Sequence, residues 1–330
     1  MPPVPPLESL ERLADAFAAL EAPIERKRML VIVNPYATTV SDRLKYLVVY
    51  ALQGRYEVDA IDTERRGHAT VLCREAAQEG YDVVVAFGGD GTVNEAANGL
   101  AGSPTPLTCL PGGATNVYAR MLGIPTDIVD ATEQLLHAAD DWRPRKVDLA
   151  HVNGRAFTFS AGVGLDASVV SRVDRNPTLK AGLRQWYFMY SAVSSFSRRY
   201  LIRPPRMDVE VGRRTVRGMT LIVQNADPYT YFANRPLHVA DGAGLETGTL
   251  AGVVLRRARP LDLPAIGARL LSRHLQVLGH RRVVGFSAET EVRMRSADGR
   301  PIPIQVDGDY IGDADEAVFG ITPGGLTVVS

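Results

Sequence analysis

The sequence has few cysteines and no net charge. Its two cysteines, Cys73 and Cys109, are too few for a disulfide framework and lack the spacing of zinc ligands, so we expect small buried side chains in a reducing compartment. Lys plus Arg and Asp plus Glu number 37 each, whereas a protein that acts mainly by binding nucleic acid usually carries a basic surplus. The composition therefore argues against nucleic acid as the main ligand.

Long hydrophobic runs are also missing. No stretch approaches the roughly 18 apolar residues of a membrane-spanning helix. The first 22 residues lack the cationic start and apolar run of a signal or transit peptide. With 45% hydrophobic residues the chain can bury a large core, and 330 residues suit about two domains. We expect a cytoplasmic protein whose contact with a membrane, if it has one, is peripheral.

The first part of the chain alternates between strand-like and helical patterns. An extension over 1–28 carries apolar residues at helical spacing between Leu7 and Leu20, which predicts one amphipathic helix. Strands are predicted near 29–33, 56–61, 82–87 and 107–110, with helices near 41–53, 68–78 and 93–100. Continuous apolar strands are typical of a parallel sheet covered on both faces. The pattern predicts a doubly wound α/β domain over 29–146, with binding loops at the carboxyl ends of its strands.

The sequence pattern changes near residue 147. Short strand-like segments with Gly and Pro between them occupy 156–160, 207–211, 220–224, 250–255, 291–295 and 302–306. They predict a mainly antiparallel β domain over 147–314, with helical insertions over 183–199 and 261–278.

A glycine-rich segment carries the strongest chemical signal. Residues 88–95 read GGDGTVNE and follow a buried strand directly. Three glycines in four positions allow close approach of a ligand, and N–H groups that lead into a helix form an anion site, for which phosphate is the natural ligand. The alternative is a plain strand-to-helix turn, which needs one glycine. No P-loop and no complete dinucleotide fingerprint occurs.

Together with Asn98 and Gly99, this segment resembles the signature of the diacylglycerol kinase catalytic domain family, which includes sphingosine, ceramide and bacterial lipid kinases. Other matching segments follow in the family's order: Asn34-Pro35, 63–69, 111–116, 147–148, 153–155, 161–167 and 306–309. The resemblance spans about 29–330. GGDGT alone is shared with NAD kinases, but the ordered series is more specific.

The resemblance implies an α/β fold in which an NAD kinase-like nucleotide domain is joined to an antiparallel β-sandwich, with residues 315–330 returning to the first domain. It implies a lipid kinase that binds ATP and Mg²⁺ in the interdomain cleft and phosphorylates a lipid hydroxyl, above all diacylglycerol or a related lipid alcohol. Two alternatives stay open. One is a kinase of a soluble hydroxyl substrate, and the other is a non-catalytic nucleotide or lipid sensor.

Four carboxylates are candidates for catalysis. By similarity to the family, Asp307 and Asp309 include the general base, with Asp90 and Asp148 in a carboxylate and water network around it. Clustered carboxylates raise one another's pKa, which suits a base near neutral pH. Asp90 could instead support magnesium. For Asp307 and Asp309, the alternative is an ordinary Asp-Gly hairpin turn around Gly308.

The resemblance assigns nucleotide binding to three loops and the start of a helix. The residues are Asn34, Thr63, Gly88, Gly89, Asp90, Gly91, Thr92, Asn94, Glu95, Gly112, Gly113, Ala114, Thr115 and Asn116. Helix capping is the alternative for Asn94 and Glu95, and an Asx turn is the alternative for Asn34. Asp166 lies where some family members bind the lipid headgroup, with a solvated loop carboxylate as its alternative.

The chain departs from the family pattern in three places. The first loop lacks its usual glycine over 36–39, and Ala114 and Val117 replace Thr and Asp in the second loop. Thr247 and Ala251 replace the two carboxylates that hold a structural magnesium in many bacterial members, so we expect no structural magnesium there. Magnesium bound with ATP stays part of the prediction, and these losses motivate the sensor alternative.

The zero net charge conceals a basic stretch. Residues 172–217 contain eleven Lys or Arg against three acids, with aromatic residues at 186–188 and 190. Such a stretch suits docking on an anionic membrane, which implies a lipid partner at the inner face of the cytoplasmic membrane. A solvated face beside a core aromatic cluster is the alternative. The sequence is compatible with a homodimer.

Overall fold

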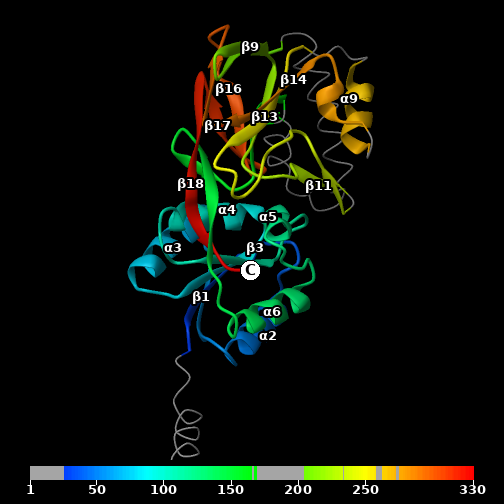
Figure 1. Cartoon of the computed structure of the whole chain (residues 1–330). Helices are drawn as coiled ribbons and strands as arrows, with labels where there is room; N and C mark the ends of the chain where they lie inside the picture. The colour runs from blue at the N-terminus through cyan, green and yellow to red at the C-terminus, as the bar shows by residue number, and fades with distance from the viewer. Residues whose placement is uncertain (1–25, 166, 169–203, 233, 258–261, 273–274) are drawn as a thin grey trace, which may run out of the picture.

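The computed structural model describes residues 26–165, 167–168, 204–232, 234–257, 262–272 and 275–330 (Figure 1). The predicted helix over 7–20, the predicted helical insertion over 183–199, Asp166 and most of the basic stretch lie outside these residues. Within the described part, no helix is both long and apolar enough to cross a membrane.

The first strands form a parallel sheet in the order β2-β1-β3-β4. They are β1 (Arg28–Val33), β2 (Glu57–Asp62), β3 (Val83–Gly88) and β4 (Leu107–Pro111). β3 and β4 are buried throughout and β1 almost so, because helices cover both of their faces, whereas β2 is an exposed edge. The carboxyl ends of β3 and β4 are paired in register, which brings the loops that follow them together.

Among the described residues, five helices pack against this part of the sheet: α2 (Asp42–Leu52), α3 (His68–Gln78), α4 (Asp90–Leu100), α5 (Val117–Met121) and α6 (Ile128–Ala138). α3 and α4 pack together on one side, and α2 and α6 pack on the other (Figure 1). The Ser41 and Asp127 side chains accept hydrogen bonds from the first turns of α2 and α6, which fixes where these helices begin. This is the doubly wound arrangement that the sequence predicted.

The same sheet continues into the second part of the molecule. Its further strands are β5 (Arg145–Val152), β6 (Arg155–Phe157), β8 (Met207–Val211), β9 (Arg214–Gly218), β15 (Glu291–Ser296) and β18 (Glu316–Val328). The long β18 is antiparallel to β5 and parallel to β4, where Val328 pairs with Leu107. The predicted boundary near 146 lies inside β5, and a ten-stranded sheet runs through it.

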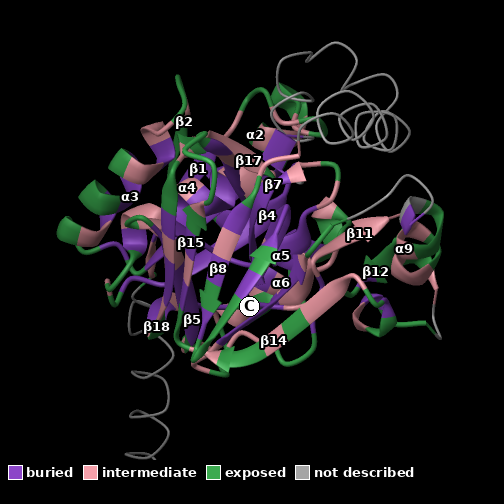
Figure 2. Cartoon of the chain, turned by 90° about the horizontal axis from the view of Figure 1, so that it is seen from above, coloured by how far each residue is buried: buried purple, intermediate pink, exposed green. Residues whose placement is uncertain are grey.

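A second, antiparallel sheet packs against this continuation. Its strands are β14 (Val283–Glu289), β13 (Leu250–Leu255), β10 (Thr220–Gln224), β7 (Ser160–Gly164), β16 (Ile302–Val306) and β17 (Asp309–Ala314), in that order. Residues from both sheets share one apolar core, with Phe157 and Phe319 fully buried in it (Figure 2). The predicted fold class, a parallel α/β part joined to an antiparallel β-rich part, is confirmed.

In the described part of the chain, three further small elements belong to neither sheet: the hairpin of β11 (Thr230–Phe232) and β12 (Arg235–Leu237), the helix α9 (Asp262–Leu271), and the 3-10 helix η2 (Val277–Gly279). α9 lies within the predicted helical insertion over 261–278. The hairpin lies above α5, between the two parts of the molecule (Figure 1).

Candidate active site

Two glycine loops pack back to back at the carboxyl ends of β3 and β4. The Gly112 N–H donates to the Gly88 carbonyl at 2.9 Å. A Cβ on Gly112 would lie 2.9 Å from the Gly88 Cα, and one on Gly113 would lie 2.7 Å from the Gly89 Cα. Side chains at these positions would push the loops apart, so the glycines are needed for the close approach.

The helix α4 begins at Asp90, directly after the first glycine loop. The N–H groups of a first helical turn have no partner inside the helix and favour anions. Thr92 in this turn is buried, and its hydroxyl accepts from the Asn34 amide at 3.1 Å. The Asn34 side-chain carbonyl accepts from the Tyr36 N–H at 3.0 Å. Asn34 therefore forms the Asx turn and also joins its loop to α4.

Asn116 closes the second glycine loop. Its side chain accepts from the Gly113 N–H at 2.8 Å and donates to the Gly113 carbonyl at 2.9 Å. This arrangement leaves Ala114 exposed at the tip of the loop and Thr115 partly exposed. Asn116 therefore shapes the loop, and the loop backbone is what it presents to a ligand.

Glu95 acts on a neighbouring helix. Its carboxylate accepts from the Gly67 N–H at 2.7 Å and from the Ala69 N–H at 3.3 Å, at the start of α3. It thus caps α3 from α4, and it fixes the loop that begins at Thr63, whose N–H donates to the Val33 carbonyl. Helix capping, the alternative given for Glu95, agrees with these contacts, although the capped helix is α3 and Glu95 lies in α4.

Asp307 is buried, with only 4% of the residue exposed, and has the left-handed backbone conformation, φ 48°. Five hydrogen bonds reach its carboxylate: from the Thr158 N–H (2.6 Å) and hydroxyl (2.8 Å), the Phe159 N–H (3.0 Å), the Ser160 N–H (3.1 Å) and the Asn94 amide (2.8 Å). Burial raises the pKa of Asp307, and these hydrogen bonds oppose the rise. Asp307 ties the turn between β6 and β7 to α4.

Asn94 completes this connection. Besides Asp307, its amide donates to the Ala156 carbonyl at 3.0 Å, and its own carbonyl accepts from the Arg155 guanidinium at 3.1 Å. The residue is fully buried. The side chain of Asn94 thus contacts groups of the β-rich part, and its role in nucleotide binding stays a prediction.

Asp309 stands on the other side of Gly308 and faces the glycine loops. A Cβ on Gly91 would lie 3.0 Å from the Asp309 carboxylate, so that carboxylate lies over the first turn of α4. Its side chain is 24% exposed, and the Arg66 guanidinium lies 3.3 Å away. Arg66 was not among the predicted site residues. It lies inside the segment 63–69 that resembles the family, which was the available signal.

Asp90 is the third carboxylate of this cluster. It accepts from the Tyr118 N–H at 3.1 Å. Burial raises its pKa to about 6; Asp307 and Asp309 add to the rise, while the N–H groups of Val117 and Tyr118 oppose it. The structure therefore brings Asp90, Asp307 and Asp309 together at the junction of the two parts.

Asp148 is held by a different set of groups. Its carboxylate accepts from the Gly248 N–H at 2.6 Å and the Gly324 N–H at 2.9 Å. Its own N–H donates to the Leu245 carbonyl. These contacts make Asp148 a tether between β5, the loop before β13, and β18.

The predicted loss of a structural magnesium site concerned the same loop. The Thr247 hydroxyl donates to the carbonyls of Gly244 and Thr249, and Ala251 is fully buried. Among the described residues, no group of three or more His, Cys, Asp or Glu is arranged to hold a metal ion.

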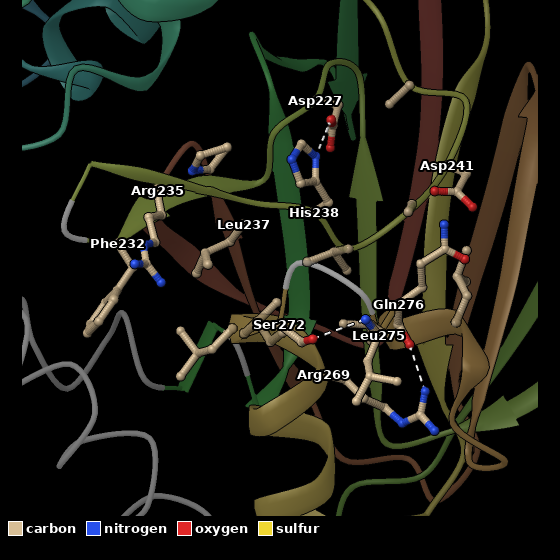
Figure 3. Close-up of a pocket in the computed structure, with 18 of the residues that line it drawn as sticks. Asp227, Phe232, Arg235, Leu237, His238, Asp241, Arg269, Ser272, Leu275 and Gln276 are labelled. Atoms are coloured by element: carbon tan, nitrogen blue, oxygen red, sulfur yellow. Dashed lines mark hydrogen bonds and ion pairs between the residues drawn. The ribbon is translucent and has the colours of Figure 1, made fainter.

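A cavity of about 800 Å³ lies between the hairpin β11–β12 and α9 (Figure 3). Most of its wall is apolar, with Leu237, Val239, Leu270, Val277 and Leu278 among the lining residues. At one end the His238 Nδ1 lies 2.6 Å from the Asp227 carboxylate. The sequence analysis did not predict this cavity, because its walls come from segments that are separated in the chain.

The cavity is linked to the carboxylate cluster through the backbone. Asn225 and Ala226, which precede Asp227, donate their N–H groups to the Phe159 carbonyl, and the Phe159 N–H donates to Asp307. The hairpin also contacts α5, where Arg120 donates to the Asn234 side chain at 2.9 Å. Cavity and glycine loops therefore lie on neighbouring sides of one junction.

Comparison with known proteins agrees with the resemblance in the sequence. The diacylglycerol kinase catalytic domain family matches residues 28–152. Diacylglycerol kinases of two Staphylococcus aureus strains are each 37% identical over 145 residues, which cover 42% of this chain and 44% of those proteins. The match thus spans less than half the length of these relatives.

The fold is similar over most of the chain. A solved structure of a diacylglycerol kinase from Bacillus anthracis str. Sterne superposes with a TM-score of 0.68 at 20% identity, and another structure from that organism does so at 0.71 and 21%. Each comparison covers 92% of this chain and 97% of the other. Residues 28–152 of this chain are therefore similar to the diacylglycerol kinase catalytic domain family, and the fold of those solved structures extends over most of the chain.

Proposed function

We propose that this protein is an ATP-dependent lipid kinase, which transfers the γ-phosphoryl group of ATP to the hydroxyl of diacylglycerol or a related lipid alcohol. One observation carries the proposal: the Asp309 carboxylate lies over the first turn of α4, where the two glycine loops meet. Phosphoryl transfer needs a cradle for phosphates, a cation and a base close together. The glycine loops, Arg66 and Asp309 supply groups of these three kinds.

The nucleotide phosphates are placed over the glycine loops at the start of α4. Loop and helix N–H groups bind phosphate oxygens there, and Arg66 adds positive charge beside them. The carboxylate of Asp90 is an oxygen ligand of the kind that Mg²⁺ prefers, so it would help to hold a magnesium that arrives with the phosphates. When bound, that ion neutralises charge on the phosphates.

Asp309 is the proposed general base. The acceptor oxygen forms a bond to the γ-phosphorus, the bond from that phosphorus to the ADP oxygen breaks, and the hydroxyl proton passes to the Asp309 carboxylate. Asp307 is less suited, because its two oxygens already accept five hydrogen bonds. Its part is to fix the backbone before Gly308, which positions Asp309.

The cavity beside the hairpin supports a lipid acceptor. Its volume of about 800 Å³ and leucine- and valine-rich wall suit acyl chains, and its polar end with His238 and Asp227 lies toward the junction. A soluble acceptor such as a dinucleotide gains little from such a wall. The names of the Staphylococcus aureus relatives point to the same acceptor class.

The proposal is tested with purified protein, labelled ATP, magnesium and vesicles that contain diacylglycerol. We expect the label in phosphatidic acid, and no label in NADP when NAD replaces the vesicles. Label in NADP alone would identify a soluble-substrate kinase. Binding of ATP in calorimetry, without turnover on a total lipid extract, would identify a sensor.

A further inference from the structure

The outer face of α9 is apolar. Pro264, Ala268 and Leu271 follow one another at helical spacing and are all exposed, so they form one stripe. Leu271 is 44% exposed, and Leu275, four residues further on, is 51% exposed. An exposed apolar patch with polar residues around it is typical of a surface that binds a partner or a membrane.

Arginines surround this stripe. The described residues of the segment 256–282 include five arginines and one acidic residue, Asp262. The exposed Arg281 and the partly exposed Arg282 lie near Asp262 in the first turn of α9, and the exposed Arg256 pairs its N–H with the Arg282 carbonyl. Arg269 lies in the last turn. The apolar stripe therefore has positive charge at both of its ends.

The stripe borders the cavity. Leu271 and Leu275 line the cavity while they are also exposed, and Arg235 of the hairpin lines it from the other side (Figure 3). A lipid held in a bilayer against this face would thus meet the cavity without crossing water.

We propose that the outer face of α9 and its flanking arginines dock on an anionic bilayer, from which the lipid acceptor enters the cavity between α9 and the hairpin β11–β12. The docking surface is independent of the chemistry, but the entry of an acceptor rests on the proposed function. Leucines insert at the boundary of headgroups and acyl chains, and arginines are attracted to lipid phosphates. A second copy of this chain fits less well, because a two-fold interface would bring two arginine clusters together.

The test introduces charge on the outer face of α9 at two exposed residues that do not line the cavity: Ala268 of the stripe and Ala265. One variant carries Ala265→Glu and Ala268→Glu, and its matched control carries Ala265→Lys and Ala268→Lys. Each unit charge near an anionic surface changes membrane binding about fivefold, so we expect sedimentation with phosphatidylglycerol vesicles to weaken about 25-fold for the Glu pair and to strengthen for the Lys pair. Both side chains are good helix formers of similar length.

A second pair of variants tests whether vesicle binding depends on the α9 face or on exposed residues elsewhere. Arg257→Gln with Arg281→Gln removes two exposed arginines and should weaken vesicle binding to a similar degree. Leu47→Gln with Val129→Gln removes exposed apolar side chains on α2 and α6 and should leave it unchanged. The proposal would be overturned if the native protein did not bind phosphatidylglycerol vesicles, or if the variant with the Glu pair bound them as strongly as the native protein does.

Turnover distinguishes this proposal from the proposed function. We expect the Glu pair to lose activity on diacylglycerol in vesicles and to keep it on a short-chain, water-soluble diacylglycerol. Vesicle binding that follows the charge changes, with no turnover on either substrate, supports the docking face and rejects the kinase. A Glu pair that converts a native dimer to a monomer without any change in vesicle binding would assign the face to a second copy and overturn the docking proposal.

Discussion

Two carboxylates on either side of Gly308 have opposite surroundings. Asp307 is buried and accepts five hydrogen bonds from two segments, whereas Asp309 is partly exposed and has Arg66 beside it. The same residue type thus serves to hold the two parts of the molecule together at one position and to face the glycine loops at the other. The two roles differ because the buried Asp307 carboxylate is surrounded by hydrogen-bond donors, whereas the Asp309 carboxylate has one ion pair.

The largest effect is expected for Asp309→Asn. Loss of a general base lowers kcat about 10²- to 10⁴-fold. Because the side chain is partly exposed and has one ion pair, the melting temperature should stay within a few degrees of the native value. Kinase assays and thermal scans on the same preparation check both halves. Full activity in this variant would move the base role away from Asp309.

Asp307→Ala should act on stability. It leaves the N–H groups of Thr158, Phe159 and Ser160 and the Asn94 amide without their acceptor in a buried place, which costs about 3 kcal/mol of unfolding free energy. Urea unfolding measures this loss. Asp309→Ala is the matched control, with an expected loss below about 1 kcal/mol. Equal losses in the two variants would contradict the difference between the carboxylates.

The sequence predicted the four strands and the helices α2, α3 and α4 of the parallel part closely, because each is a continuous apolar run or a helical repeat between turn residues, but it did not predict α5 and α6. It predicted that Asp90, Asp307 and Asp309 belong together through the resemblance alone. The donors around Asp307 could not be foreseen, since they come from residues about 150 and 210 positions earlier in the chain. The partners of Glu95 could not be foreseen either, because Gly67 and Ala69 lie at the start of another helix; its part in nucleotide binding stays a prediction from the resemblance.

The effect of Asp90→Asn on stability should depend on pH. An acid whose pKa is about 6 in the folded protein and 3.8 in the unfolded chain destabilises the fold as it ionises. Native stability should therefore fall between about pH 4 and pH 6 from this group, and the Asn variant should avoid that loss. Equilibrium unfolding should show equal stability near pH 4 and an advantage of about 1–3 kcal/mol for the variant above pH 7. An advantage that is equally large at pH 4 would show that ionisation of Asp90 is not its cause.

Arg66→Gln should have the smallest effect. The ion pair with Asp309 joins an exposed guanidinium to a partly exposed carboxylate, and such pairs contribute between about 0 and 1 kcal/mol. We therefore expect almost unchanged unfolding in urea. Activity should respond more, because the cation lies where the proposed function puts the phosphates: KM for ATP should rise severalfold while kcat changes less, and Arg66→Lys should restore most of it. A large loss of kcat with unchanged KM would instead mean that Arg66 acts through Asp309, which would extend the difference between the two carboxylates to the residues that hold them.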